Sequence, residues 1–93
     1  MAATFWPFKD PGETLDYTID WSVRLGTDTI VASSFTIVSG SVVIQSQLAT
    51  TLTTTVWLSG GTLNETCDIL NVVTTLGGRT MDQNIGLKIR TRK

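Results

Sequence analysis

Residues 15–21 have the sequence LDYTIDW, in which apolar and polar side chains alternate without a break. Leu15, Tyr17, Ile19 and Trp21 fall on one face of an extended chain, and the polar residues between them fall on the other. Successive side chains of a β-strand point to opposite sides, so a period of two is typical of a strand with one buried face. This stretch therefore predicts a half-buried strand.

Turns that contain glycine or proline divide the rest of the chain into segments of similar character. DPG at residues 10–12, GG at 60–61 and GG at 77–78 are examples, because these residues supply the backbone angles that tight turns require. No segment between the turns has the 3.6-residue period of an amphipathic helix. We expect further strands at residues 29–37, 42–48, 54–59, 66–75 and 85–89, with a possible edge strand at 4–8, where Pro7 cannot donate a ladder hydrogen bond.

The phase of the apolar residues predicts which side of each strand is buried. Within residues 29–37 the apolar side chains change phase, which indicates a β-bulge or a bend. Trp57 is expected on the outer face of its strand, and so are Leu70 and Val72. The side chains expected to face the core are Val42, Ile44, Leu48, Val56, Leu58, Cys67, Ile69, Val73, Ile85, Leu87 and Ile89.

This pattern predicts an all-β fold. Six or seven short strands in 93 residues indicate an immunoglobulin-like two-sheet antiparallel β-sandwich, with a small closed or partly open barrel as the alternative. The glycines at 60–61 mark the loop where we expect the chain to pass from one sheet to the other. We expect a single domain over residues 1–93, with 1–9 as a possible N-terminal arm or edge strand and 90–93 as a basic tail.

The composition excludes most catalytic chemistry. The chain has no histidine, which is the usual general base near neutral pH and the commonest metal ligand. Its one cysteine, Cys67, cannot form an intramolecular disulfide and is expected to be a small buried apolar residue. We therefore expect a protein that is not an enzyme, with no cofactor, no metal and no small-molecule substrate.

The distribution of charge indicates contacts with other protein chains. Residues 29–64 form a run of 36 residues without a charged side chain, whereas monomeric proteins usually place lysine or glutamate on exposed strands. Uncharged polar groups are less costly to remove from water than charged ones. This run favours packing against other chains over a threonine-rich surface that faces only solvent.

Positive charge is concentrated near the C-terminus. Residues 79–93 contain five basic residues and one acidic residue, whereas residues 1–78 contain two basic and seven acidic ones. One interpretation is a solvated strand end whose charges oppose aggregation, and the other is a basic tail that docks on an acidic neighbour. The net charge of −1 argues against nucleic acid as a partner, and no apolar run is long enough to span a membrane, so no membrane partner is expected.

The N-terminal segment FWPF at residues 5–8 has two interpretations. It is either an edge strand that caps the chain's own core or an arm that inserts into a neighbouring subunit, because aromatic residues are typical interface anchors. Together with the apolar residues expected to face outward and the basic residues near the C-terminus, this segment makes up the set of candidate interface residues. They are Phe5, Trp6, Phe8, Trp57, Leu70, Val72, Lys88, Arg90, Arg92 and Lys93.

Three motifs occur in order along the chain. DPGETLDYTIDW at residues 10–21, followed by LGTDTI at 25–30, precedes TTTVWLSGGT at 53–62 and TTLGGRT at 74–80. Over about residues 9–90 the chain thus resembles a family of small tailed-bacteriophage virion structural proteins, described as fiber–tail adaptor-like. It departs from that family at Cys67, where members tend to have an aromatic residue.

The resemblance implies a small β-sandwich that is present in several copies in the virion. Such an adaptor joins the tail body to a tail fiber or a neighbouring tail protein. Its partners would be other copies of itself and phage tail or fiber proteins, and it would be made in the host cytoplasm and located in the tail region of the virion. The alternatives are a head–tail connector, a capsid decoration protein, and a module that binds a host surface or carbohydrate.

Overall fold

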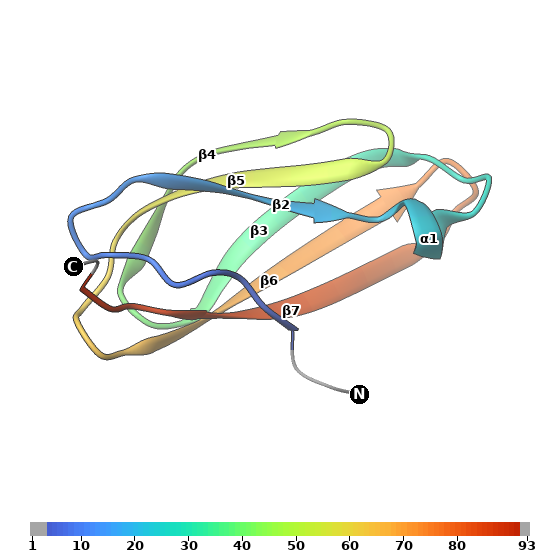
Figure 1. Ribbon diagram of the computed structural model, residues 1–93. Helices are drawn as coiled ribbons and strands as arrows, with labels where there is room; N and C mark the ends of the chain where they lie inside the picture. The colour runs from blue at the N-terminus through green and yellow to red at the C-terminus, as the bar shows by residue number, and fades with distance from the viewer. Residues whose placement is uncertain (1–3, 92–93) are drawn as a thin grey trace.

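Two β-sheets pack face to face in the computed structural model, which describes residues 4–91 (Figure 1). The four-stranded sheet has the order β1 (Thr4–Phe5), β7 (Thr80–Lys88), β6 (Thr66–Thr75) and β3 (Ile30–Ser39). The three-stranded sheet has the order β2 (Leu15–Asp20), β5 (Thr53–Gly60) and β4 (Val42–Ala49). Neighbouring strands are antiparallel, except that β1 runs parallel to β7.

This topology confirms the prediction of an immunoglobulin-like β-sandwich. Strands β2, β5 and β4 occupy the places of strands B, E and D of an immunoglobulin domain, and β3, β6 and β7 occupy those of C, F and G. The chain passes from one sheet to the other between β5 and β6, as expected. Gly60 and Gly61 lie at that point with φ angles of 74° and 103°, which side chains other than glycine rarely adopt.

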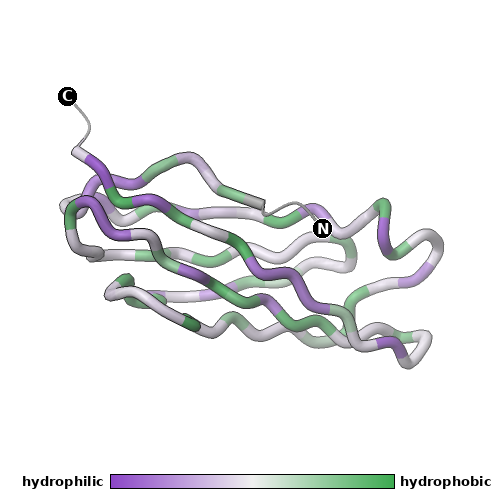
Figure 2. Tube along the Cα trace, turned by 90° about the horizontal axis from the view of Figure 1, so that it is seen from below, coloured by the Kyte–Doolittle hydropathy of each residue, from purple (hydrophilic) through white to green (hydrophobic). Residues whose placement is uncertain are grey.

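The predicted burial phase is confirmed in β5, β6 and β7. Val56, Leu58, Cys67, Ile69, Val73, Ile85, Leu87 and Ile89 all lie in the core, at 1% exposure or less. Most of their outward neighbours in β5 and β6 are half-buried, and apolar and more polar residues alternate along the tube in Figure 2. The sandwich therefore forms because these strands each present one apolar face, and burying both faces removes them from water.

The inward position predicted for Leu48 is wrong. Val42 and Ile44 face the core, but the pairing of β4 with β5 shifts between Ile44 and Ser46, which is a β-bulge. A bulge adds one residue and reverses the phase of everything that follows it. Leu48 consequently lies on the outside with 56% of its surface exposed. The change of phase predicted within residues 29–37 is confirmed, because the pairing of β3 with β6 shifts near both ends of β3.

A short helix, α1 (Ser22–Leu25), follows β2 and was not expected from the sequence. One turn is too short to produce a helical repeat in the sequence, and it buries only Leu25. Among residues 4–91, no helix has the length and apolar character needed to cross a membrane.

A polar cluster joins the two sheets within the core. The indole Nε1 of Trp21 donates hydrogen bonds to Thr54 Oγ1 at 3.0 Å and to Asn71 Oδ1 at 3.1 Å. The amide Nδ2 of Asn71 donates to Ser33 Oγ and to the carbonyl of Ser34. Asn71 and Thr54 are fully buried, and their polar groups are acceptable there because they bond to one another.

Candidate interaction surfaces

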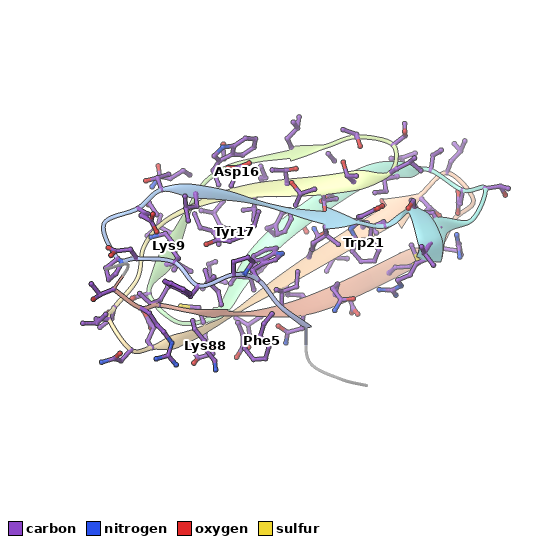
Figure 3. All side chains as sticks on the ribbon, viewed as in Figure 1. Phe5, Lys9, Asp16, Tyr17, Trp21 and Lys88 are labelled. Atoms are coloured by element: carbon purple, nitrogen blue, oxygen red, sulfur yellow. The ribbon has the colours of Figure 1, made fainter. Side chains whose placement is uncertain are left out.

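The outer face of the four-stranded sheet brings together four of the predicted interface residues. Leu70 and Val72 project outward from β6 and are half-buried. On the two strands beyond β6, Lys88 of β7 and Phe5 of β1 form one group, with the Lys88 ammonium 5.6 Å from the centre of the Phe5 ring. Figure 3 shows both side chains on the outer side of this sheet. We call Phe5, Leu70, Val72 and Lys88 the β6–β7 face.

Gly86 determines where Phe5 lies on this face. A Cβ atom at Gly86 would overlap the Phe5 ring, so the ring rests directly on the backbone of β7. The main chain holds it there, since β1 pairs Phe5 with Gly86 and the Trp6 amide donates to the Gly86 carbonyl at 3.0 Å. Phe5 nevertheless keeps 52% of its surface exposed, so a flat aromatic surface is presented outward.

The outer face of the three-stranded sheet carries Trp57. On the two neighbouring strands Asp16 and Ser46 lie directly opposite Trp57. Val43 and Leu48 of β4 are also on the outside, with 51% and 56% of their surfaces exposed. We call Trp57, Val43 and Leu48, with Asp16 beside them, the β4–β5 face. Asp16 lies on the opposite side of the molecule from Phe5 and Lys88 (Figure 3).

Sequence reasoning did not single out Val43 or Leu48 as surface residues. The signal available for Val43 was its phase, since it alternates with Val42 and Ile44. The position of Leu48 depends on the bulge in β4, which is a property of the pairing with β5 and has no clear mark in the sequence.

The structure places Trp6 and Phe8 differently from Phe5. The ring of Trp6 stacks on Tyr17, with ring centres 4.7 Å apart, and packs against the core. Trp6 thus covers the core of its own chain and leaves a smaller surface for a partner. Phe8 is 38% exposed and lies beyond the strand.

The basic end of the chain lies beside the loop between β5 and β6. Arg90 is exposed, and its amide donates to the carbonyl of Lys9. Arg92 and Lys93 lie outside the described residues. Lys9 is fully buried, and its ammonium donates to the carbonyls of Gly60 at 2.6 Å and Asp10 at 2.9 Å. Burial lowers the pKa of Lys9. Because Lys9 is buried against these carbonyls, the surface charge at this end of the molecule comes from Lys88 and Arg90.

Cys67 has the buried position predicted for it. The thiol is fully buried, and Gly40 packs so closely on it that a Cβ atom there would overlap the sulfur. Burial raises the pKa of the Cys67 thiol, which keeps it protonated and unreactive.

Comparison with known proteins identifies the family. No curated protein gives a significant match. A family model described as "Podophage GP4 fiber-tail adaptor protein gp77" matches residues 9–88, which include both outer faces except for Phe5. The match spans most of the chain and agrees with the three motifs that suggested a fiber–tail adaptor. The chain therefore belongs to the podophage GP4 fiber-tail adaptor family, whose members are structural proteins of the phage tail.

Proposed function

We propose that this protein is a non-enzymatic adaptor that joins the tail body to a tail fiber or to a neighbouring tail protein, in multiple copies. The observation that carries the proposal is the presence of two different apolar surfaces on opposite sides of one sandwich. A protein with two such surfaces can bind two partners at the same time, which is what an adaptor does. Its synthesis in the host cytoplasm and its place in the virion tail belong to the same proposal.

The two surfaces differ in chemistry, which favours two different partners. The β6–β7 face combines aromatic and aliphatic side chains with charges of both signs, because Asp68 and Asp82 lie on the same side of the sheet as Lys88. The β4–β5 face combines an indole ring and aliphatic side chains with the negative charge of Asp16. Complementary charge selects partners and orients them, while buried aromatic and aliphatic groups supply most of the binding energy.

The same asymmetry of charge supports contacts between copies. Lys88 and Arg90 form a basic end, and most of the remaining charges of the chain are acidic. A basic end of one copy next to an acidic surface of another is a head-to-tail contact, and such contacts build rings when the rotation closes.

Binding to purified tail particles tests the adaptor role, with one variant for each face. We expect Leu70→Glu to abolish capture of the protein by particles that lack it, because a charge cannot be buried in an apolar contact. We expect Trp57→Ala to reduce the attachment of the second partner while leaving the fold intact. The matched control is Leu76→Ser, which changes an apolar residue that is 77% exposed in the turn between β6 and β7, away from both faces.

Two results would contradict the proposal. One is a wild-type protein that is strictly monomeric and does not bind tail particles. The other is a particle reconstruction by cryo-electron microscopy that locates the chain on the capsid surface or at the head–tail junction. The first location would identify a decoration protein, and the second a connector.

A further inference from the structure

Strand β3 ends the four-stranded sheet and leaves one of its edges unpaired. Its ten residues pair with β6 on one side, and within residues 4–91 no strand pairs with it on the other. An unpaired edge presents backbone N–H and C=O groups that can accept another strand. Proteins usually protect such edges with charged residues, proline, a bulge or a very short strand.

The other three sheet edges each carry one of these protections, and the middle of β3 does not. In the part of the chain that the structure describes, β1 spans two residues, and Pro7 follows it closely. β2 carries Asp16 and Asp20, and β4 contains a bulge between Ile44 and Ser46. In β3 the pairing shifts only near the two ends, so residues 32–37 form a regular, uncharged strand.

We propose that β3 pairs antiparallel with β3 of a second copy of this chain, about a two-fold axis at the middle of the strand. The pairing joins the two four-stranded sheets into one continuous sheet across the dimer. It rests on the proposed function, since it specifies one contact by which several copies of the adaptor associate. It uses the backbone edge of β3 and leaves the two outer faces uncovered, although Ser34 and Thr36 lie directly beside Val72 and Leu70 of the β6–β7 face.

The absence of charge is what favours a second copy as the occupant. A two-fold axis at the middle of the strand places the residues near the axis close to their own counterparts, so a charged side chain there meets the same charge. Like charges directly opposite each other destabilise a strand pair. The whole of residues 29–64 lacks charge, and this removes the penalty for pairing with itself. An axis at Phe35 sets Ser34 opposite Thr36 of the partner copy, and such hydroxyl pairs stabilise antiparallel strands.

One contact within the chain competes with this pairing. The amide of Phe35 donates to Oε1 of Gln47, a side chain of β4, at 3.1 Å. In a free monomer, part of the β3 edge is thus already hydrogen-bonded, which lowers the free energy gained on dimerisation. We therefore expect a reversible dimer that forms at high local concentration, as on a tail that binds several copies.

Sedimentation equilibrium of the full chain over a range of concentrations tests the inference. The wild type should form a dimer within the range up to roughly 100 µM. The dimer should persist in about 1 M salt, because no charged contact holds the β3 edges together, whereas a head-to-tail contact between charged surfaces would be screened.

Lysines placed at the edge give the decisive variant. Ser34→Lys with Thr36→Lys puts like charges opposite each other across the axis, and we expect at least tenfold weaker dimerisation. The matched control places the same two lysines on the same sheet but away from this edge, as Thr80→Lys with Asn84→Lys in β7, and should dimerise like the wild type. Mixing the lysine variant with Ser34→Glu and Thr36→Glu should restore dimers through opposite charges, which a merely unfolded variant could not do.

Each outcome supports or overturns the inference. A wild type that stays monomeric, or a dimer that survives Ser34→Lys with Thr36→Lys, overturns it. A monomeric wild type whose binding to tail particles is lost in the lysine variant also overturns it, and shows that a tail protein contacts the β3 edge or the adjacent Leu70 and Val72. Dimers that do not bind tail particles would uphold this contact and refute the adaptor function, while monomers that bind them would do the reverse.

Discussion

Asn71 connects the two sheets through hydrogen bonds in a region where the remaining contacts are apolar. It accepts from Trp21 and Thr54 and donates to Ser33 and Ser34, and none of its surface is exposed. Sequence reasoning left it unassigned, because a lone asparagine in a threonine-rich strand does not stand out. Its position was the available signal, since Asn71 has the same phase as Ile69 and Val73.

Replacement of Asn71 should therefore be costly. We expect Asn71→Ala to lower the free energy of unfolding by about 2–4 kcal/mol, because it leaves the buried Thr54 hydroxyl without its acceptor and opens a small cavity. Chemical denaturation followed by the fluorescence of the three tryptophans measures the change. The control is Asn84→Ala on the exposed side of β7, which should change stability by no more than about 0.5 kcal/mol. Equal losses in both variants would show that the buried bonds contribute nothing.

At the scale of secondary-structure elements, Asp28 links the turn between β6 and β7 to the start of β3. The carboxylate accepts hydrogen bonds from the amides of Gly77 and Thr29 at 2.9 Å, and Arg79 Nε lies 3.1 Å from it. A hydrogen bond from the Thr75 hydroxyl is the largest cause that lowers the pKa of Asp28, followed by the bond from Gly77. The folded state thus favours the ionised carboxylate.

This makes stability depend on pH in a defined direction. A carboxyl whose pKa is lower in the folded state stabilises the protein above its unfolded pKa of about 4, and this stabilisation is lost as the pH falls below that value. The denaturation midpoint of the wild type should drop between about pH 5 and pH 2. Asp28→Asn should be less stable at neutral pH and should show a shallower drop. The stability of this variant should still decrease somewhat with falling pH, because hydrogen bonds also lower the pKa values of Asp20 and Glu65.

The control for Asp28→Asn is Asp82→Asn, which removes one charge on the exposed side of β7. It should keep the neutral-pH stability of the wild type. If Asp28→Asn lost stability with acid as steeply as the wild type does, the hydrogen bonds to Asp28 would not be responsible for the slope.

The pairing of β1 with β7 determines how firmly the N-terminal aromatic segment is attached to the sandwich. Gly86→Ala places a methyl group where the Phe5 ring lies, so we expect β1 to detach from β7. Hydrogen exchange should then become faster at the Trp6 amide, which donates to Gly86, and stay slow in β6. In a Phe5→Ala background the same change should have little further effect, because the two substitutions remove one contact. Unchanged protection of Trp6 in Gly86→Ala would contradict this account.

The strands illustrate what sequence patterns can and cannot predict. The inward phase of Val56, Leu58 and Ile69 was predictable, because alternation is a local property of each strand. The outward position of Leu48 was not, because the bulge in β4 arises from its pairing with β5. Likewise, the outward direction of Leu70 was predictable from its phase. That Leu70 shares a face with Phe5 was not, because it depends on the parallel pairing of β1 with β7, which is a long-range contact.

For the whole molecule, the separation of charge makes a prediction about assembly. Neutralising the basic end by Arg90→Gln, Arg92→Gln and Lys93→Gln should weaken binding to tail particles at low salt. The difference from the wild type should shrink in about 1 M salt, where charges separated by more than roughly 3 Å are screened. Substitution is preferable to truncation, because the amide of Arg90 donates to the carbonyl of Lys9 and shortening the chain would remove that bond.

A variant that keeps the charge separates electrostatics from shape. Arg90→Lys with Arg92→Lys preserves both positive charges, and it should bind like the wild type if the basic end acts by charge alone. Loss of binding in this variant would instead indicate specific guanidinium hydrogen bonds to a carboxylate of the partner. If the neutral variant binds as well as the wild type at low salt, the basic residues serve solubility, and binding rests on the two apolar faces.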